Sequence, residues 1–245
     1  MKKYFLVLFL IGCSATDEII DADPNVRLNK IKSLMSEENY LEALVDLKTL
    51  RLEYPANSFA DTVQFLIAEC YFLKNDLINA TTEYEQVIIN MPQSNFVSDA
   101  TFKRALAYYK LSPKSSLDQK YSFSAIEGFQ SFFEYKNNDS LKVNAENNIS
   151  IINEKLAKKI FDNAEIYYKM NLNKAAVIYY DLLMERFPDS KYSESSLYKK
   201  ILALKKRKLS EQVKRETENF ISKYPQSEFV NEIKSIIKSE NNNAK

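Results

Sequence analysis

The chain has 245 residues, of which 45% are hydrophobic and 27% are charged, and its formal net charge is +1. A chain of this size can bury a substantial core, but the lack of histidine and the presence of only two glycines exclude a Ser-His-Asp triad and disfavour glycine-rich phosphate-binding loops. The nearly neutral charge is unlike that of a nucleic-acid-binding protein, so we expect no nucleic acid among the partners.

The first residues have the pattern of an export signal. Two lysines precede the apolar run 4–11, which is too short to span a bilayer but has the length of a signal-peptide core. The run leads into Gly12-Cys13-Ser14, which resembles a lipobox, where a cysteine thiol receives diacylglycerol before cleavage. We therefore predict a signal peptide over 1–12 and a lipid on Cys13. Because Ser14 is not the aspartate that retains lipoproteins at the inner membrane, we predict an outer-membrane location. The alternative is an ordinary signal peptide that contains a cysteine.

The number of cysteines agrees with the predicted export and lipidation. Lipidation of Cys13 would leave Cys70 as the only other cysteine, so no disulfide could form within the mature chain. Cys70 lies in the apolar stretch 65–73, and the chain offers no histidine base to activate it. We predict that Cys70 is a small buried hydrophobic residue and not a nucleophile.

We interpret the polar segment 13–24 as a lipidated tether. After this segment, the same short sequence motif ends four segments of the chain. An aromatic residue or a methionine precedes a proline, and a serine follows within three residues. Proline cannot continue a helix, and serine can accept a backbone N–H bond at a helix start, so we predict helix ends at the prolines and helix N-caps at the serines. The prolines are Pro55, Pro92, Pro188 and Pro225, and the serines are Ser58, Ser94, Ser190 and Ser227.

Upstream of each proline, apolar residues are spaced by four and three positions and so lie on one helical face. A small residue begins each set twelve positions before the proline: Ala43, Ala80, Ala176 and Val213, with a weaker copy at Ala125. A second set of apolar residues, spaced by three, lies further upstream, and its small members are Ala68, Ala105 and Ala164. Small residues on both sets would let two helices cross closely.

The two sets together predict five helix pairs. Positions 43 and 80, and positions 176 and 213, are each separated by 37 residues, and this arrangement resembles the tetratricopeptide repeat. We predict an all-α fold, a right-handed superhelix of about five tetratricopeptide-type helix pairs. An irregular helical bundle is the alternative, but it does not account for the repeated spacing. The alanines predicted at the helix crossings are Ala43, Ala68, Ala80, Ala105, Ala125, Ala164 and Ala176.

Two insertions interrupt the repeat. The first, 112–119, is rich in serine and is typical of a loop inside the third pair. The second precedes the fourth pair, where residues 140–169 contain neither proline nor glycine and keep apolar residues on one face. We predict one continuous helix there, about thirty residues long, which joins repeats three and four. The resulting divisions are repeats one to three over 25–138, repeats four and five with a capping helix at about 229–237 over 139–240, and a polar tail over 241–245.

The lipobox, the tether, the five repeats with their proline-serine joints and the long helix after the third repeat together resemble the BamD family. Its members are lipoprotein subunits of the bacterial outer-membrane β-barrel assembly machine. The resemblance is most specific over 155–190, and it is weakest at the third repeat, where Asn137 stands in the place of the proline. It implies a non-enzymatic scaffold, without cofactor or metal, on the periplasmic face of the outer membrane. It also implies that the C-terminal repeats bind the barrel-forming subunit and that the N-terminal repeats bind unfolded outer-membrane protein precursors.

Charge is distributed unevenly along the repeats. Residues 37–99 hold eleven acidic and three basic residues, whereas residues 199–215 hold eight basic residues and one acidic residue. The two ends should therefore prefer different partners. Alternatively, the charges belong to solvated helix faces, with the basic ones favourably placed at a helix C-terminus. The candidate partner-binding residues are Lys205, Lys206, Arg207 and Lys208.

Two other functions fit parts of the pattern. Another tetratricopeptide lipoprotein scaffold of the cell envelope, acting in wall synthesis, competence or polysaccharide export, would share the helical periodicity. Such a scaffold has no reason to share a long helix with three repeats before it and two after it. A lipid-anchored hydrolase is disfavoured because histidine is absent and no clustered acid pair stands out.

Overall fold

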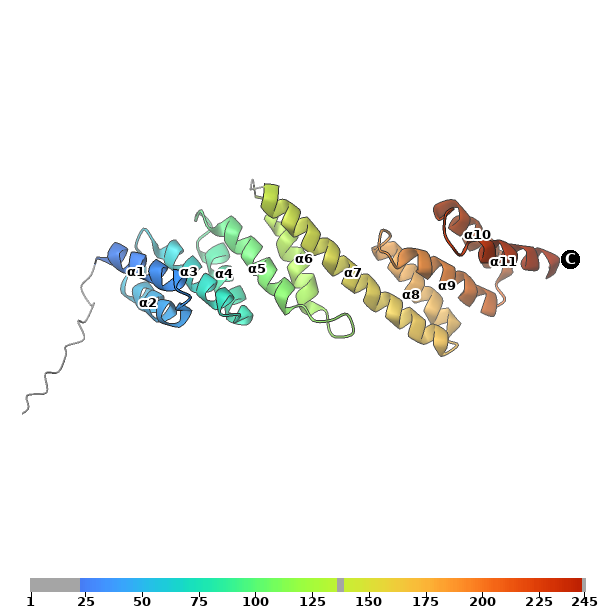
Figure 1. Ribbon diagram of the computed structural model, residues 1–245, viewed down its shortest axis with the longest axis horizontal. Coiled ribbons are helices and arrows are strands. Elements are labelled where there is room, and N and C mark those ends of the chain that lie inside the picture. Colours follow the sequence, from blue (N-terminus) through green and yellow to red (C-terminus); the bar gives the residue numbers. More distant parts are fainter. Residues whose placement is uncertain (1–22, 136–138, 244–245) are drawn as a thin grey trace, which may run out of the picture.

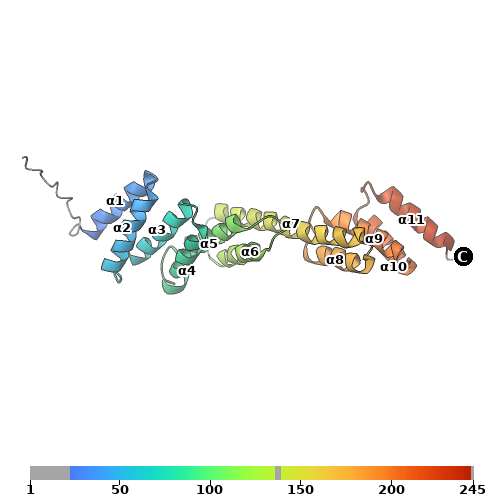
Figure 2. The same cartoon turned by 90° about the horizontal axis from the view of Figure 1, so that it is seen from below.

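The computed structural model describes residues 23–135 and 139–243, and over these ranges the chain forms eleven α-helices and no strand. Each helix contacts the next one along the chain, and Figure 1 shows the helices stacked along one long axis from α1 to α11. The same elongated order is seen after a quarter turn in Figure 2. The predicted all-α fold with five helix pairs is confirmed, and the handedness of the superhelix stays a prediction. The helices are α1 (Pro24–Ser36), α2 (Tyr40–Glu53), α3 (Ala60–Leu73), α4 (Leu77–Asn90), α5 (Val97–Leu111), α6 (Lys120–Phe132), α7 (Asp139–Lys169), α8 (Asn173–Arg186), α9 (Ser193–Lys206), α10 (Ser210–Lys223) and α11 (Val230–Asn243).

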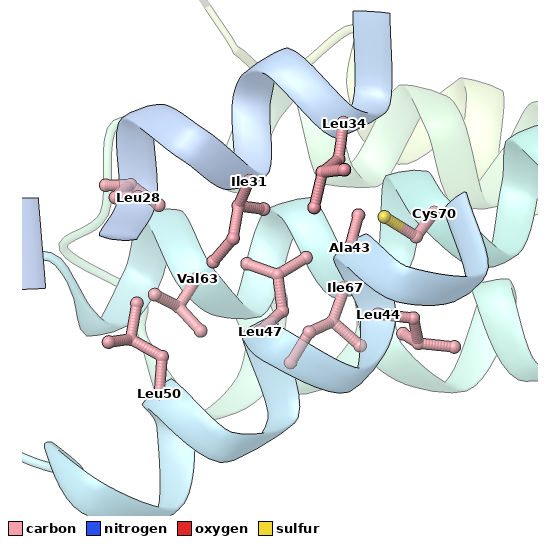
Figure 3. Close-up of a cluster of buried hydrophobic side chains, with 10 residues drawn as sticks. All are labelled: Leu28, Ile31, Leu34, Ala43, Leu44, Leu47, Leu50, Val63, Ile67 and Cys70. Atoms are coloured by element: carbon pink, nitrogen blue, oxygen red, sulfur yellow. The ribbon is translucent and has the colours of Figure 1, made fainter. Parts of the chain in front are cut away.

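The first hydrophobic core shows how the sequence pattern produces the stack. Apolar residues spaced by three and four positions place one face of α1, one of α2 and one of α3 toward a common interior (Figure 3). Since α3 belongs to the second pair, burial of Val63 and Ile67 ties the first pair to the second. Stacking therefore buries the apolar faces that one pair alone would expose. The buried members are Leu28, Ile31, Leu34, Ala43, Leu44, Leu47, Leu50, Val63, Ile67 and Cys70.

The turns inside four of the five pairs share a left-handed residue. In each turn the next N–H group bonds to a carbonyl five positions earlier, as Asp76 N does to Tyr71 O at 2.9 Å. This is the geometry of a Schellman motif, which satisfies carbonyls at the end of the first helix. The third pair has the insertion 112–119 at this place instead. The left-handed residues are Glu38 (φ 61°), Asn75 (φ 60°), Asn171 (φ 59°) and Lys208 (φ 57°).

The prolines end helices as predicted. Helices α2, α4, α8 and α10 each stop two residues before Pro55, Pro92, Pro188 and Pro225, respectively. The residue between the helix and the proline leaves the helical region, as Tyr54 does with φ −131° and ψ 59°. A proline ring disfavours the helical conformation of the residue before it, which explains this common end.

The prediction that the serines cap the following helices was wrong. Ser94, Ser190 and Ser227 accept the N–H of the residue two positions later, at 3.1, 3.2 and 3.1 Å, and the next helix begins three residues after each serine. Ser58 instead donates to the Asn57 side chain at 3.0 Å. A serine hydroxyl can close such a local turn as readily as a helix start, so residue type alone does not place the cap.

The predicted long helix is present as α7, which has 31 residues and spans about 46 Å. Its first half buries Ala145 and Ile152 against the third pair, and its second half buries Ala164 against α8. The division of the chain at residue 138 stays a prediction, because residues 136–138 lie outside the described ranges.

The final helix extends further than predicted. Helix α11 continues to Asn243, so the segment predicted as a polar tail is partly helical. The apolar pattern that revealed this helix ends at Ile237, and only the lack of proline and glycine beyond it allows the helix to continue. No helix of the described ranges has both the length and the apolar character needed to cross a membrane.

The insertion 112–119 is fixed to α7. Lys155 donates a hydrogen bond to Ser112, and burial lowers the pKa of this lysine. Lys159 donates to the Leu117 carbonyl at 2.9 Å. The loop that the sequence predicts therefore forms part of the joint between the third pair and α7.

Gly128 lies at a close crossing of α5 and α6, and we predict that Gly128→Ala destabilises the fold. A Cβ atom on Gly128 of α6 would lie 2.8 Å from the Ala105 Cβ of α5. Alanine favours a helix by about 1 kcal/mol over glycine, but overpacking of a core costs about 1 to 3 kcal/mol. A lower thermal midpoint measured by circular dichroism would show that overpacking prevails. Adding Ala105→Gly should recover stability, and a double variant less stable than both single variants would contradict this account.

Candidate protein-binding surfaces

The seven alanines predicted at helix crossings are all fully buried. Each has 0% exposed surface, so these residues pack inside the stack and present no side chain to a partner. The candidate surfaces must therefore come from other residues. The alanines are Ala43, Ala68, Ala80, Ala105, Ala125, Ala164 and Ala176.

A glutamate, a tyrosine and a lysine from three consecutive helices form a partly buried polar link. Glu69 of α3 accepts a hydrogen bond from the Tyr84 hydroxyl of α4 through Oε1, and its Oε2 lies 3.0 Å from Lys103 Nζ of α5. Burial and the neighbouring Glu69 raise the pKa of Tyr84 far above its usual range, so the hydroxyl remains a donor. The link fixes α3 to α4 and to the next repeat.

The same link occurs again 96 residues later. Tyr180 of α8 donates to Glu165 Oε1 of α7 at 2.5 Å, and Glu165 Oε2 lies 3.8 Å from Lys199 Nζ of α9. Burial and the bond to Glu165 also raise the pKa of Tyr180 above its usual range. The same contact of a glutamate, a tyrosine and a lysine therefore joins three consecutive helices in two parts of the stack.

The candidate basic run lies where α9 ends. Lys205 and Lys206 are the last residues of α9, Arg207 caps it, and Lys208 occupies the left-handed turn. The three lysines are exposed and Arg207 is half-buried. Within the described part of the chain none of the four forms an ion pair, although Lys206 Nζ lies 3.9 Å from the centroid of the Tyr168 ring. These positive charges are free to meet a partner.

Several other basic residues of the 199–215 block form ion pairs within the chain. Lys200 is only 8% exposed, and its Nζ lies 2.6 Å from Asp181 and 3.2 Å from Glu216. Arg215 also pairs with Glu216 at 3.1 Å. Burial raises the pKa of Glu216, but the attraction of Lys200 and the hydrogen bonds to its carboxylate lower it further, and the net shift is downward. The set of unpaired positive charges is therefore smaller than the sequence block.

The acidic block 37–99 is neutralised in part by similar pairs. Four of its glutamates face a basic residue of another helix. A count of charges along the sequence thus overstates the electrostatic potential at the surface of both ends of the stack. The pairs are Arg27–Glu53, Arg51–Glu83, Lys103–Glu69 and Arg104–Glu85.

Two of the pockets beside the C-terminal repeats combine apolar and charged side chains. One, of about 480 Å³, is lined by Ile149 of α7 and by Phe187 and other residues of the turn after α8. The other, of about 500 Å³, is lined by Leu172 and Ile178 and by Arg207 of the basic run. Leu172 and Ile178 are 48% and 57% exposed. An apolar surface beside a charged rim is the arrangement of many protein-protein interfaces.

Within the ranges that the structure describes, no group of three or more cysteine, aspartate or glutamate side chains could hold a metal ion.

Comparison with known proteins identifies the family. The model of the YfiO family, described as outer membrane lipoprotein, matches residues 21–218. The chain belongs to this family of outer membrane lipoproteins. The outer membrane protein assembly factor BamD of Rickettsia prowazekii (strain Madrid E) is 21% identical to it over 244 residues, which cover 96% of this chain and 94% of the relative. The resemblance predicted from the sequence is confirmed.

Solved structures with some similarity are helical repeat proteins. The complex of the yeast Sti1 TPR2AB domain with pHSP90 is 15% identical, covers 82% of this chain and 78% of that chain, and has a TM-score of 0.44. A tetratricopeptide repeat protein from Parabacteroides merdae ATCC 43184 is 14% identical, covers 89% of this chain and 73% of that chain, and has a TM-score of 0.36.

The duplicated polar link was missed by the sequence reasoning. The link is marked in the sequence by the motif Phe-x-x-Ala-Glu-x-Tyr, followed by phenylalanine or tyrosine. This motif occurs at 65–72 and again at 161–168. The apolar members of this motif supported the repeat prediction, but its glutamates, Glu69 and Glu165, were not noticed. The spacing of 96 residues crosses both insertions, so a search for 37-residue repeats does not find it.

The two cysteines lie in different parts of the chain. Cys13 falls outside the described residues, so lipidation stays a prediction. Cys70 is fully buried in the first core, as predicted.

We predict that Cys70 resists Ellman's reagent at pH 8 in the native protein. Burial raises the pKa of this thiol to about 11, so only about one molecule in a thousand would carry a thiolate at that pH. Unfolding in guanidinium should release the thiol for rapid reaction. Fast labelling of native protein that unfolding does not accelerate would contradict the burial.

Proposed function

We propose that the chain is a non-enzymatic scaffold of the outer-membrane β-barrel protein assembly complex. The observation that carries the proposal is the match of an outer membrane lipoprotein family over 21–218, together with a relative named as an outer membrane protein assembly factor. A rigid stack of helix pairs with exposed, charged and apolar sites suits binding of other proteins.

The C-terminal repeats would bind the barrel-forming subunit. Support comes from the unpaired basic run at the end of α9 and from the apolar pocket of Leu172, Ile178 and Arg207 beside it. Apolar contacts would provide affinity, and the surrounding charges would steer the encounter.

The N-terminal repeats would receive unfolded outer-membrane protein precursors. Their second helices expose several large apolar side chains that an extended chain could contact. The excess of acidic residues over 37–99 would give this end a different preference from that of the basic end. The exposed apolar residues are Leu41, Val45, Leu52, Ile78 and Ile89.

A lipid on Cys13 would hold the scaffold on the periplasmic face of the outer membrane. Segment 14–23 lies between that cysteine and α1, and ten extended residues reach about 35 Å. The first helix pair would then stay within about that distance of the membrane.

Affinity purification of the tagged full chain from solubilised membranes tests the proposal. The barrel-forming subunit should co-purify and be identified by mass spectrometry. Co-purification of wall-synthesis, competence or polysaccharide-export proteins without that subunit would reject it in favour of another envelope scaffold. Depletion of the chain should also lower the amount of folded barrel proteins in the outer membrane.

A further inference from the structure

Two lysines lie over one aromatic ring at two separate places in the stack. In the N-terminal repeats, Lys103 and Lys110 of α5 place their Nζ atoms 5.2 and 5.3 Å from the centroid of the Phe72 ring of α3. In the C-terminal repeats, Lys199 and Lys206 of α9 lie 5.6 and 3.9 Å from the Tyr168 centroid of α7. We call these the α5 site and the α9 site.

The two sites are copies with a constant offset. Every member of the α9 site stands 96 residues after its counterpart in the α5 site. A pair of stacked aromatic rings repeats with the same offset: the centroids of Phe65 and Phe96 are 4.7 Å apart, and those of Phe161 and Tyr192 are 5.3 Å apart. Solvated surface lysines would have no reason to repeat in this way, so the repetition indicates a built arrangement.

The charges at each site are not balanced. Glu69 uses Oε1 for Tyr84 and Oε2 for Lys103, so it has no oxygen aimed at Lys110. Lys110 is exposed, and among the described residues no carboxylate pairs with it.

The α9 site shows the same imbalance. Glu165 accepts from Tyr180 through Oε1 and faces Lys199 through Oε2. Lys206 is exposed and unpaired with any carboxylate of the described ranges. Two ammonium groups held over one ring repel each other, and an anion from outside would relieve the repulsion.

We propose that the α5 and α9 sites each bind one carboxylate of an acidic segment in a partner protein. Two lysines and one glutamate leave each site with one excess positive charge, which matches an aspartate or glutamate side chain. The near-neutral chain as a whole, at +1, argues against a polyanion such as nucleic acid as the occupant. The ring and the lysine stems offer an apolar surface to the methylenes of the bound acidic side chain.

The α5 site lies outside the basic block that the sequence predicts, so this inference adds a second anion-binding surface in the other half of the stack (Figure 1). It does not depend on which envelope complex the chain serves.

Binding of a defined acidic peptide tests the inference. The probe is a fluorescein-labelled hexapeptide of alternating glutamate and serine with blocked ends, and its glutamine analogue is the control peptide. Fluorescence anisotropy with the full chain in detergent at low salt should show binding of the glutamate peptide only. The double variant Lys110→Gln/Lys206→Gln should weaken binding by about tenfold or more, because each change removes a charge-assisted contact.

A matched double variant is Lys120→Gln/Lys234→Gln, which removes one exposed lysine from each half. It should change the affinity less than twofold, a factor of the size expected from screened surface charges. Carbodiimide cross-linking of the bound glutamate peptide should concentrate on Lys110 and Lys206 when mapped by mass spectrometry.

Three outcomes would overturn the inference: equal loss of binding in both double variants, cross-links spread over all exposed lysines, or tighter binding of a labelled oligothymidylate that depends on Lys110 and Lys206. Loss of peptide binding with normal co-purification of the barrel-forming subunit would leave the proposed function standing. The reverse result would leave the two anion sites standing.

Discussion

Replacing Cys13 with alanine should remove most of the protein from the outer-membrane fraction. The apolar leader ends one residue before Cys13, and a lipid on that thiol would supply the attachment. Each buried methylene of an acyl chain contributes about 0.8 kcal/mol, so losing more than one chain removes lasting attachment. Cys13→Ala should therefore appear as uncleaved precursor or as soluble periplasmic protein on immunoblots of sucrose-gradient fractions.

Cys70→Ala provides the matched control for that experiment. Cys70 is buried and its side chain differs from alanine by one sulfur atom, so this variant should stay in the outer membrane. Both variants should be followed in cells depleted of the barrel-forming subunit, since partners could hold an unlipidated chain at the membrane. A Cys13→Ala protein that remains in the outer membrane under depletion would show that the lipobox interpretation is wrong.

The helix pairs could be predicted because the physical signal is local. Apolar residues three and four positions apart define a helical face without knowledge of the partner helix, and the proline after each second helix marks its end. The long helix α7 followed from the same logic, since 140–169 lacks both helix breakers and keeps one apolar face.

Helix starts were less predictable. A serine near a helix start can cap the helix or close a turn, and the backbone decides between the two. In this chain Ser94 and its equivalents close turns, at hydrogen-bond distances of 3.1 to 3.2 Å.

Contacts between repeats could not be predicted either. Lys103 and Glu69 are 34 residues apart, and nothing in the spacing of charges shows that these two pair while Lys110 does not. Similarly, the sequence marks 112–119 as a loop, but the hydrogen bonds from Lys155 and Lys159 that hold it on α7 depend on the path of the loop. Counting charges along the sequence therefore predicts the sign of the net charge at each end of the stack, but it does not show which charged residues remain unpaired.

Reversing the basic run should weaken binding of the barrel-forming subunit. In the full chain carrying Lys205→Glu, Lys206→Glu, Arg207→Glu and Lys208→Glu, affinity for the periplasmic region of that subunit should fall by about tenfold or more at low salt. The four charges are unpaired with acidic residues of the described ranges, and Arg207 lines the pocket of Leu172 and Ile178. Affinity should be measured by titration at several salt concentrations. The salt dependence should flatten, because exposed charges act mainly through screened attraction.

The control for this variant is reversal of four exposed lysines of the N-terminal repeats, which changes the net charge by the same amount. These are Lys30, Lys32, Lys114 and Lys120. Acidic residues at a helix C-terminus interact unfavourably with the helix dipole, so thermal midpoints must be compared before affinities are interpreted. If the two variants have equal stability and lose affinity equally, net charge and not the α9 terminus controls the encounter. If reversal of the basic run leaves binding unchanged at low salt, the barrel-forming subunit binds elsewhere, and the assignment of separate partners to the two halves must be abandoned while the fold stands.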